Sequence, residues 1–96
     1  RLPIAMGDQP LTILMGIQGR EELKRHLENS KNVVIMKIGT HLEKVKSVLT
    51  ETGHLNKAIV IEKATMPEQK IFTLIEYTKS KTPYFSIILV SEEHYE

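Results

Sequence analysis

One stretch of the chain passes from a strand directly into a helix, Val33-Val34-Ile35-Met36-Lys37-Ile38-Gly39-Thr40-His41-Leu42-Glu43. Its first four residues form a continuous apolar run, which is typical of a strand covered on both faces, and we expect that strand to continue to Gly39. Thr40 and Glu43 have the spacing of a capping box, in which both side chains satisfy backbone donors at the start of a helix. The stretch therefore predicts a buried strand, a short turn and a helix.

The elements around this stretch follow from the spacing of apolar residues. The helix that begins at Thr40 is predicted to end at Gly53, which can take the left-handed conformation of a helix C-cap. Upstream, alternating apolar residues predict a strand over residues 11–15 after a turn at residues 7–10, and a helix follows over residues 20–29. The second helix buries one apolar stripe, which we place in the core: Leu42, Val45, Val48 and Leu49.

Three further strands are predicted in the second half of the chain, over residues 58–61, 71–77 and 84–91. Residues 62–69 are expected to form a loop, because Pro67 has no amide hydrogen for a sheet ladder. We expect the last two strands to be antiparallel neighbours. The order strand, helix, strand, helix and three strands predicts an α/β fold, a mixed five-stranded sheet with flanking helices in a single domain over residues 1–96.

Composition excludes several classes of function. Thirteen basic and twelve acidic side chains are scattered along the chain and give a net charge of +1, so we expect no nucleic-acid or membrane partner. The absence of cysteine excludes disulfides and thiolate chemistry, and fits a cytoplasmic protein. The four histidines do not have metal-ligand spacing, and no nucleophile or phosphate-loop motif is present. We therefore assign neither a catalytic residue nor a metal ligand.

Two predicted loops are candidates for ligand binding. Ligands of α/β sheets bind beyond the carboxyl ends of the parallel strands, where residues 37–40 and residues 64–67 both follow a predicted strand. If these two strands are parallel, both loops lie at the same edge. Lys37 is expected either to extend into solvent, which we favour, or to contact an anion. Residues 65–67 form either a simple loop or one wall of a site for a flat ligand.

Three blocks of sequence resemble the tetrapyrrole methylases of cobalamin biosynthesis, and in particular their C20-methylating subgroup. These blocks are residues 34–39, residues 58–69 with the run Ala-Thr-Met-Pro-Glu-Gln, and residues 82–90 with Pro-Tyr-Phe-Ser. Residues 7–11 are similar to the start of the second domain in that family. The resemblance covers nearly the whole chain and implies the C-terminal domain of a two-domain methylase, whose N-terminal domain is not part of this sequence.

The resemblance also implies a function and a set of contacts. It implies transfer of a methyl group from S-adenosylmethionine to C20 of a tetrapyrrole, precorrin-2 or cobalt-factor II, by a homodimeric enzyme. Ile38 stands where the family often has methionine, so cofactor recognition there would use its backbone. The residues expected to contact the cofactor are Ile38, Ala64, Thr65, Met66, Thr82, Pro83 and Tyr84. The alternative from the residues alone is a small stand-alone α/β module that binds another ligand or regulates a partner.

Overall fold

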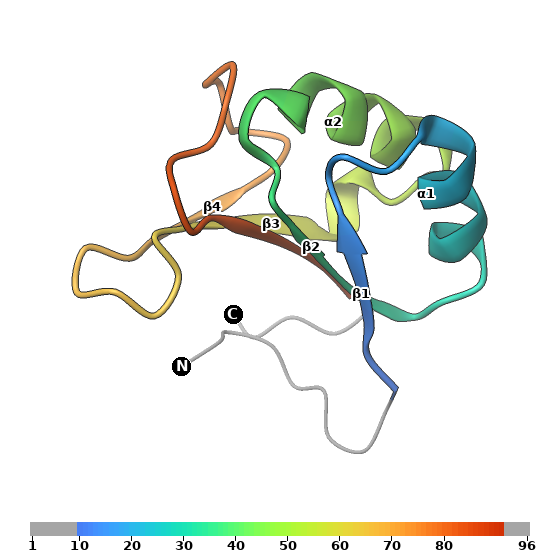
Figure 1. Cartoon of the computed structure of the whole chain (residues 1–96), viewed down its shortest axis with the longest axis horizontal. Helices are drawn as coiled ribbons and strands as arrows, with labels where there is room; N and C mark the ends of the chain where they lie inside the picture. The colour runs from blue at the N-terminus through green and yellow to red at the C-terminus, as the bar shows by residue number, and fades with distance from the viewer. Residues whose placement is uncertain (1–9, 92–96) are drawn as a thin grey trace.

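The computed structural model describes residues 10–91, which form a five-stranded sheet with two helices packed on one of its faces (Figure 1). The strands are β1 (Thr12–Met15), β2 (Asn32–Met36), β3 (Ala58–Glu62), β4 (Lys70–Thr73) and β5 (Ile87–Ser91). The helices are α1 (Arg20–Glu28) and α2 (Leu42–Glu51), with short 3-10 turns at Gly39–His41 and Leu55–Lys57. The predicted mixed α/β sheet with flanking helices is confirmed.

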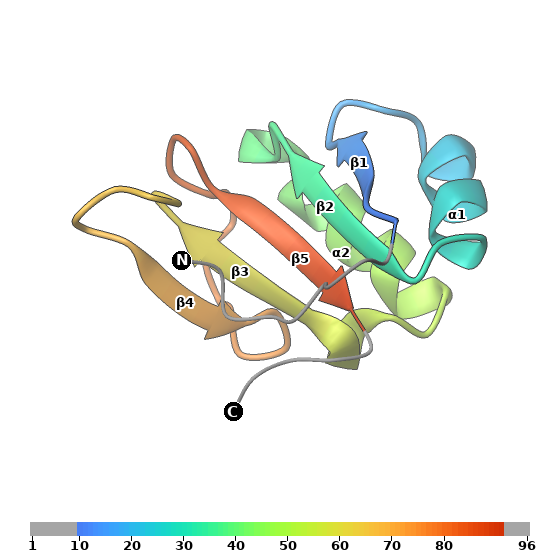
Figure 2. The same cartoon turned by 90° about the horizontal axis from the view of Figure 1, so that it is seen from below.

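The strand order across the sheet is β1-β2-β5-β3-β4, which Figure 2 shows from the face opposite the helices. β1 and β2 are parallel, whereas β5 runs antiparallel to both β2 and β3, and β4 runs antiparallel to β3. Since β2 and β3 are both antiparallel to β5, they point in the same direction. Their carboxyl ends therefore lie at the same edge of the sheet, as the sequence predicts.

The predicted pairing of the last two strands is wrong. β4 and β5 are not neighbours, because β5 inserts between β2 and β3 while β4 pairs with the outer side of β3. The physical reason lies in the composition of β5. Ile88 and Leu89 are completely buried, and such a strand belongs in the middle of a sheet, whereas three of the four residues of β4 are exposed, as expected at an edge.

Several element boundaries also differ from the prediction. β2 ends at Met36 and not at Gly39, because Lys37 takes a left-handed backbone with φ of 52°. The strand predicted over residues 71–77 ends at Thr73, and that predicted from residue 84 begins at Ile87. The capping box is absent: a 3-10 turn precedes α2, and no side chain caps either start. Gly53 has φ of 78°, so the left-handed conformation predicted after α2 is confirmed.

The core consists of two layers of side chains, one on each face of the sheet. The larger layer lies under the helices, where the predicted stripe of α2 is fully buried together with Leu23 and Leu27 of α1. The smaller layer lies on the other face and contains Val34, Ile59, Ile61 and Leu89. The alternation of β2 and β5 between these layers confirms that both strands are apolar on both faces.

Some sequence predictions fall outside the described residues, namely the turn at residues 7–9 and the histidine at position 94. Within residues 10–91, no helix is both long and apolar enough to cross a lipid bilayer.

Candidate functional site

Three chain segments meet at the edge of the sheet where β2 and β3 end, and we call this edge the rim: residues 37–39, 63–66 and 82–86. The third segment leads into β5 and lies between the other two. Its Thr82 amide donates a hydrogen bond to the Gly39 carbonyl at 3.3 Å, and the Ala64 amide donates to the Phe85 carbonyl at 2.8 Å. The two loops selected from the sequence are thus joined through residues 82–86.

The backbone of the rim is strained. Four non-glycine residues of the described chain have positive φ, namely Lys37, Lys63, Thr65 and Phe85, and all four lie in or directly beside these segments. Thr65 is β-branched, so its φ of 65° is especially unfavourable. Such conformations cost on the order of 1–3 kcal/mol each and cluster at ligand-binding sites, where the surroundings hold the chain in one shape.

The structure brings the predicted site residues to this rim, but their side chains lie in different surroundings. The Ile38 side chain is 1% exposed and packs in the core below the rim, so only its backbone can face a ligand. Ala64 is half-buried, while Thr65 and Met66 are exposed. The Thr65 hydroxyl donates to the Ala64 carbonyl at 2.5 Å, and the Thr65 amide donates to the Gln69 side chain at 2.8 Å.

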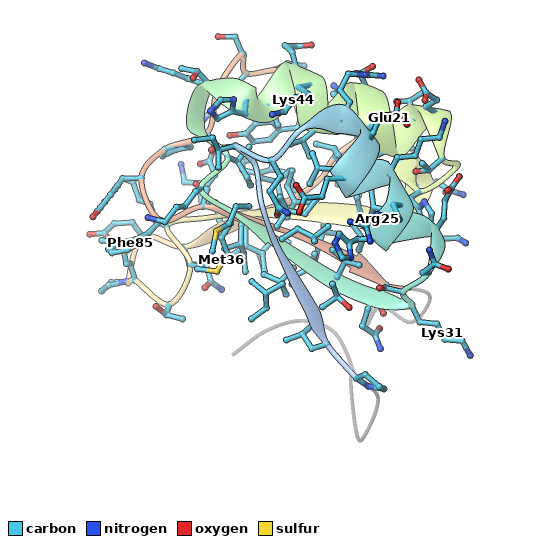
Figure 3. All side chains as sticks on the ribbon, turned by 45° about the vertical axis from the view of Figure 1, so that its right-hand side comes forward. Glu21, Arg25, Lys31, Met36, Lys44 and Phe85 are labelled. Atoms are coloured by element: carbon cyan, nitrogen blue, oxygen red, sulfur yellow. The ribbon has the colours of Figure 1, made fainter. Side chains whose placement is uncertain are left out.

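The third segment combines buried hydroxyls with an exposed aromatic pair. Tyr84 and Phe85 are 80% and 59% exposed, with ring centroids 4.2 Å apart, and Figure 3 shows Phe85 and Met36 at this end of the molecule. In contrast, Thr82 and Ser86 are 7% and 5% exposed, and neither hydroxyl oxygen has a hydrogen-bond partner among residues 10–91. A buried hydroxyl without a partner is costly, which marks this segment as one built to meet another polar group.

Sequence analysis missed Gly16, which supports the rim from below. Its amide donates to the Met36 carbonyl at 2.7 Å, and a Cβ atom at this position would lie 2.8 Å from the Lys37 carbonyl oxygen and 2.9 Å from the Ile38 Cα atom. Only glycine allows the turn after β1 to approach the backbone of the rim so closely. The signal in the sequence is a glycine directly after a predicted strand, but the chain segment it contacts is 20 residues away.

Sequence analysis also missed a buried carboxylate at the end of β3. Glu62 is 4% exposed, and its Oε2 accepts hydrogen bonds from the Tyr77 hydroxyl and the Lys79 ammonium group, both at 2.6 Å. Burial alone would raise the pKa of the Glu62 carboxyl, but these two hydrogen bonds and the charges of Lys79 and Lys70 outweigh burial and lower it. Burial, together with the bond to Glu62, raises the pKa of the Tyr77 hydroxyl.

Acid should therefore destabilise the fold through Glu62. Because the folded-state pKa lies below the usual 4.5, its stabilising contribution is complete above that value and disappears as the pH falls through the folded pKa. We expect the free energy of unfolding to fall more steeply between about pH 5 and about pH 3 in the wild type than in Glu62→Gln. Urea unfolding across this pH range measures the difference, and parallel pH profiles would contradict it.

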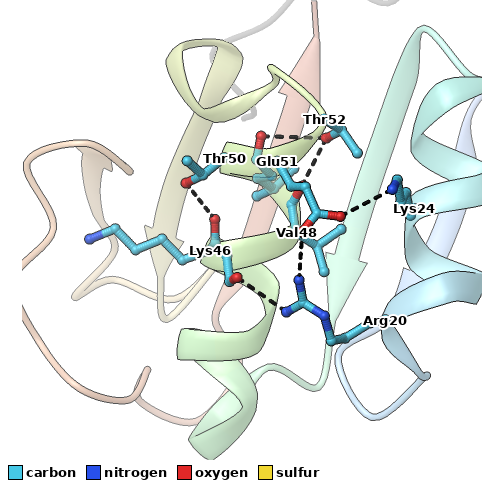
Figure 4. Close-up of polar contacts among 9 residues, drawn as sticks. Arg20, Lys24, Lys46, Val48, Thr50, Glu51 and Thr52 are labelled. Atoms are coloured by element: carbon cyan, nitrogen blue, oxygen red, sulfur yellow. Dashed lines mark hydrogen bonds and ion pairs between the residues drawn. The ribbon is translucent and has the colours of Figure 1, made fainter.

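A further polar cluster joins the two helices. Arg20 and Lys24 of α1 form ion pairs with Glu51 of α2 at 3.0 and 3.1 Å (Figure 4), and these exposed contacts join the two helices away from the rim. Among residues 10–91, no group of three or more histidine or acidic side chains could hold a metal ion. A surface hollow lined by Pro10, Thr12 and residues 29–31 lies at the opposite end of β1 and β2.

Comparison with known proteins identifies the fold family. The family described as Tetrapyrrole (Corrin/Porphyrin) Methylases matches residues 1–77, which is most of the chain. The chain belongs to the tetrapyrrole methylase family. The family resemblance seen in the sequence is confirmed.

Named tetrapyrrole methylases support this assignment. The chain is 37% identical over 89 residues to a precorrin-2 C(20)-methyltransferase of Sinorhizobium sp., covering 93% of the chain and 36% of that protein. It is 25% identical over 95 residues to a cobalt-precorrin-2 C(20)-methyltransferase of Salmonella typhimurium, covering 97% and 40%. The chain thus spans between a third and a half of the length of these two relatives.

A solved structure has the same fold. The cobalt precorrin-4 methyltransferase CbiF superimposes with a TM-score of 0.64 at 21% identity, covering 95% of this chain and 44% of that one. This likeness confirms the predicted architecture of a tetrapyrrole methylase.

Proposed function

We propose that this chain is the C-terminal, S-adenosylmethionine-binding domain of a methyltransferase that methylates C20 of precorrin-2 or cobalt-factor II in cobalamin biosynthesis. The observation that carries the proposal is the meeting of the three resemblance segments at one strained rim, joined by the Ala64–Phe85 and Thr82–Gly39 backbone bonds. Ligands of α/β sheets bind at such an edge, beyond the carboxyl ends of the parallel strands.

The residues of the rim fit the adenosine part of this cofactor. An adenosine offers a flat ring and several polar atoms, and the rim offers exposed apolar surface at Met66 and Tyr84 together with the exposed Thr65 hydroxyl. The Thr82 hydroxyl is buried, so its contact with the cofactor would require a local shift of residues 82–86. The backbone of Ile38 and of Ala64 and the ring of Pro83 complete the proposed contact set.

The chemistry requires positioning more than acid or base groups. S-adenosylmethionine, when bound, supplies an electrophilic methyl group to a nucleophilic carbon of the tetrapyrrole. Holding two reactants in line can contribute on the order of 7–11 kcal/mol to lowering a barrier, so a rigid rim without titrating side chains suits this task. We accordingly assign no catalytic residue to this chain.

The proposed substrate is chosen from the names of the relatives and their sequence identity to this chain. Two relatives are named as methyltransferases acting at C20 of precorrin-2 or cobalt-precorrin-2, whereas the solved structure is named for precorrin-4 and shares 21% identity. The higher identity to the first relative, 37%, favours C20.

Two partners complete the proposal. An N-terminal methylase domain would supply the opposite wall of the cofactor site and most of the tetrapyrrole site, consistent with the share of the relatives' length that the chain covers. The complete enzyme is proposed to be a cytoplasmic homodimer.

Calorimetry with S-adenosylmethionine and a methylation assay on precorrin-2 test the proposal. The two-domain protein should bind the cofactor and methylate the substrate, whereas the 96-residue chain should fold without turnover and bind the cofactor more weakly. Turnover by the chain alone would contradict the two-domain proposal. Absence of cofactor binding by the two-domain protein would favour the alternative, a stand-alone α/β module.

We expect Thr65→Val to weaken cofactor binding in the two-domain protein. The hydroxyl sits on the exposed rim, and loss of one hydrogen bond costs about 1 kcal/mol, or roughly a fivefold rise in Kd measured by calorimetry. The matched control is Thr50→Val on α2, whose hydroxyl donates to the Lys46 carbonyl at 2.8 Å away from the rim. Equal affinities in the two variants would remove Thr65 from the site.

A further inference from the structure

Glu62 is a buried carboxylate to which the proposed methyl transfer assigns no role. It is the last residue of β3, and its side chain is 5% exposed. Burying a charged group is expensive unless it is paired and hydrogen-bonded, as Glu62 is by Tyr77 and Lys79. Both donors belong to the segment between β4 and β5, so the carboxylate ties that segment to the end of β3.

The segment that Glu62 holds continues directly into the rim. Residues 77–81 precede Thr82, whose amide bonds to the Gly39 carbonyl, and Phe85, whose carbonyl accepts from Ala64. On the other side, Glu62 is followed at once by Lys63, with φ of 51°. The carboxylate therefore stands at the junction of two of the three rim segments.

Further contacts fix the two donors. The Lys79 ammonium group lies 6.0 and 5.9 Å from the ring centroids of Phe72 and Tyr77, and these two rings meet edge to face at 5.4 Å. Lys46 of α2 donates to the Tyr77 carbonyl at 3.1 Å. Tyr77 is thus held at its hydroxyl, its ring and its backbone carbonyl.

We propose that Glu62 is a positioning residue for the rim, which holds residues 77–85 against the end of β3 and so fixes Ala64 and Thr82 without touching the ligand. The identity of the ligand as S-adenosylmethionine rests on the proposed function. The effect of Glu62 on the local order of the rim is independent of that function.

Hydrogen exchange of the protein without ligand tests the local order. Glu62→Gln keeps the size of the side chain and an acceptor for Tyr77 but removes the charge that holds Lys79. We expect the Ala64 and Thr82 amides to exchange at least about tenfold faster in this variant, while amides in α1 and α2 accelerate no more than the loss in the global free energy of unfolding accounts for. The matched control is Glu51→Gln, which breaks the exposed ion pairs between the helices and should leave the rim amides unchanged.

Cofactor titration of the two-domain protein tests the consequence for binding. If Glu62→Gln leaves the rim ordered for about a tenth of the time, the apparent Kd for S-adenosylmethionine rises about tenfold, with kcat at saturation unchanged. Lys79→Met should act in the same direction, and because Lys79 is 53% exposed, this variant avoids burying a new group. Lys79→Arg keeps the charge and should restore both exchange rates and affinity.

The outcomes separate this proposal from the proposed function. Unchanged exchange at Ala64 and Thr82 in both Glu62→Gln and Lys79→Met would overturn the positioning role, as would exchange that accelerates by the same factor at the rim and in the helices. If the wild type binds no S-adenosylmethionine while exchange responds as expected, the cofactor assignment fails and the positioning role stands. If Glu62→Gln does not fold, Lys79→Met alone decides.

Discussion

Gly16→Ala is expected to displace the rim and to abolish measurable cofactor binding by the two-domain protein. The added Cβ atom would meet the Lys37 carbonyl oxygen at 2.8 Å and the Ile38 Cα atom at 2.9 Å. Both are backbone atoms and cannot rotate away like the end of a side chain, so the turn after β1 or the rim must shift. Overpacking of this kind costs about 1–3 kcal/mol, which thermal or urea unfolding would measure.

The matched control for this substitution is Gly19→Ala, three residues further along the same turn. A Cβ atom at Gly19 has no neighbour within 4 Å among the described residues, so the substitution should cost less than about 1 kcal/mol, chiefly through its position before α1. Cofactor affinity should remain at the wild-type value. If both variants have the same free energy of unfolding and the same cofactor affinity, the close approach of Gly16 to the rim is not required for stability or binding.

Ile38→Ala is expected to cause the largest loss of stability among the variants considered. Ile38 is 1% exposed and packs in the main core with Leu42 and Val45 of α2, so truncation removes apolar contacts and leaves a cavity. Substitutions of this type cost about 2–5 kcal/mol, measured as a lower free energy of unfolding in urea. Because the backbone of the rim rests on this side chain, cofactor affinity should fall as well.

Ile38→Met is the informative companion to this variant. Methionine has a similar volume, and volume-conserving core substitutions usually cost less than about 1.5 kcal/mol. Since the side chain lies in the core, the sulfur should add no contact to the ligand, and affinity should match that of the wild type. A marked gain of affinity in Ile38→Met would show that this side chain turns toward the cofactor.

The sequence predicts the elements of this fold better than their arrangement. The helix predicted over residues 20–29 and the apolar stripe of α2 follow from local periodicity, and the shared direction of β2 and β3 follows from the helix that connects them. The position of β5 does not, because its pairing with β2 and β3 depends on residues far away in the chain. The predicted capping box is also wrong, because a 3-10 turn at residues 39–41 precedes the helix and no side chain caps it.

In the candidate site, too, the features that follow from the local sequence are predicted and those that depend on distant contacts are missed. Residues 37–40 and 64–67 can be placed at one edge from strand direction alone. Gly16 and Glu62 cannot be found in this way, because their importance depends on contacts with the Lys37 carbonyl and with Tyr77 and Lys79. A glutamate at a strand end is usually exposed, and nothing local indicates that this one is buried.

The central position of β5 also has a consequence for biosynthesis. The strand is the last described element of the chain, and its Ser91 hydroxyl donates to the Asn32 side chain, 59 positions earlier. During translation, β2 and β3 leave the ribosome with their facing backbone groups unpaired, and they stay so until residues 87–91 follow. We therefore expect the sheet to close late, through contacts between segments far apart in the chain, and we expect the nascent domain to be prone to aggregation until then.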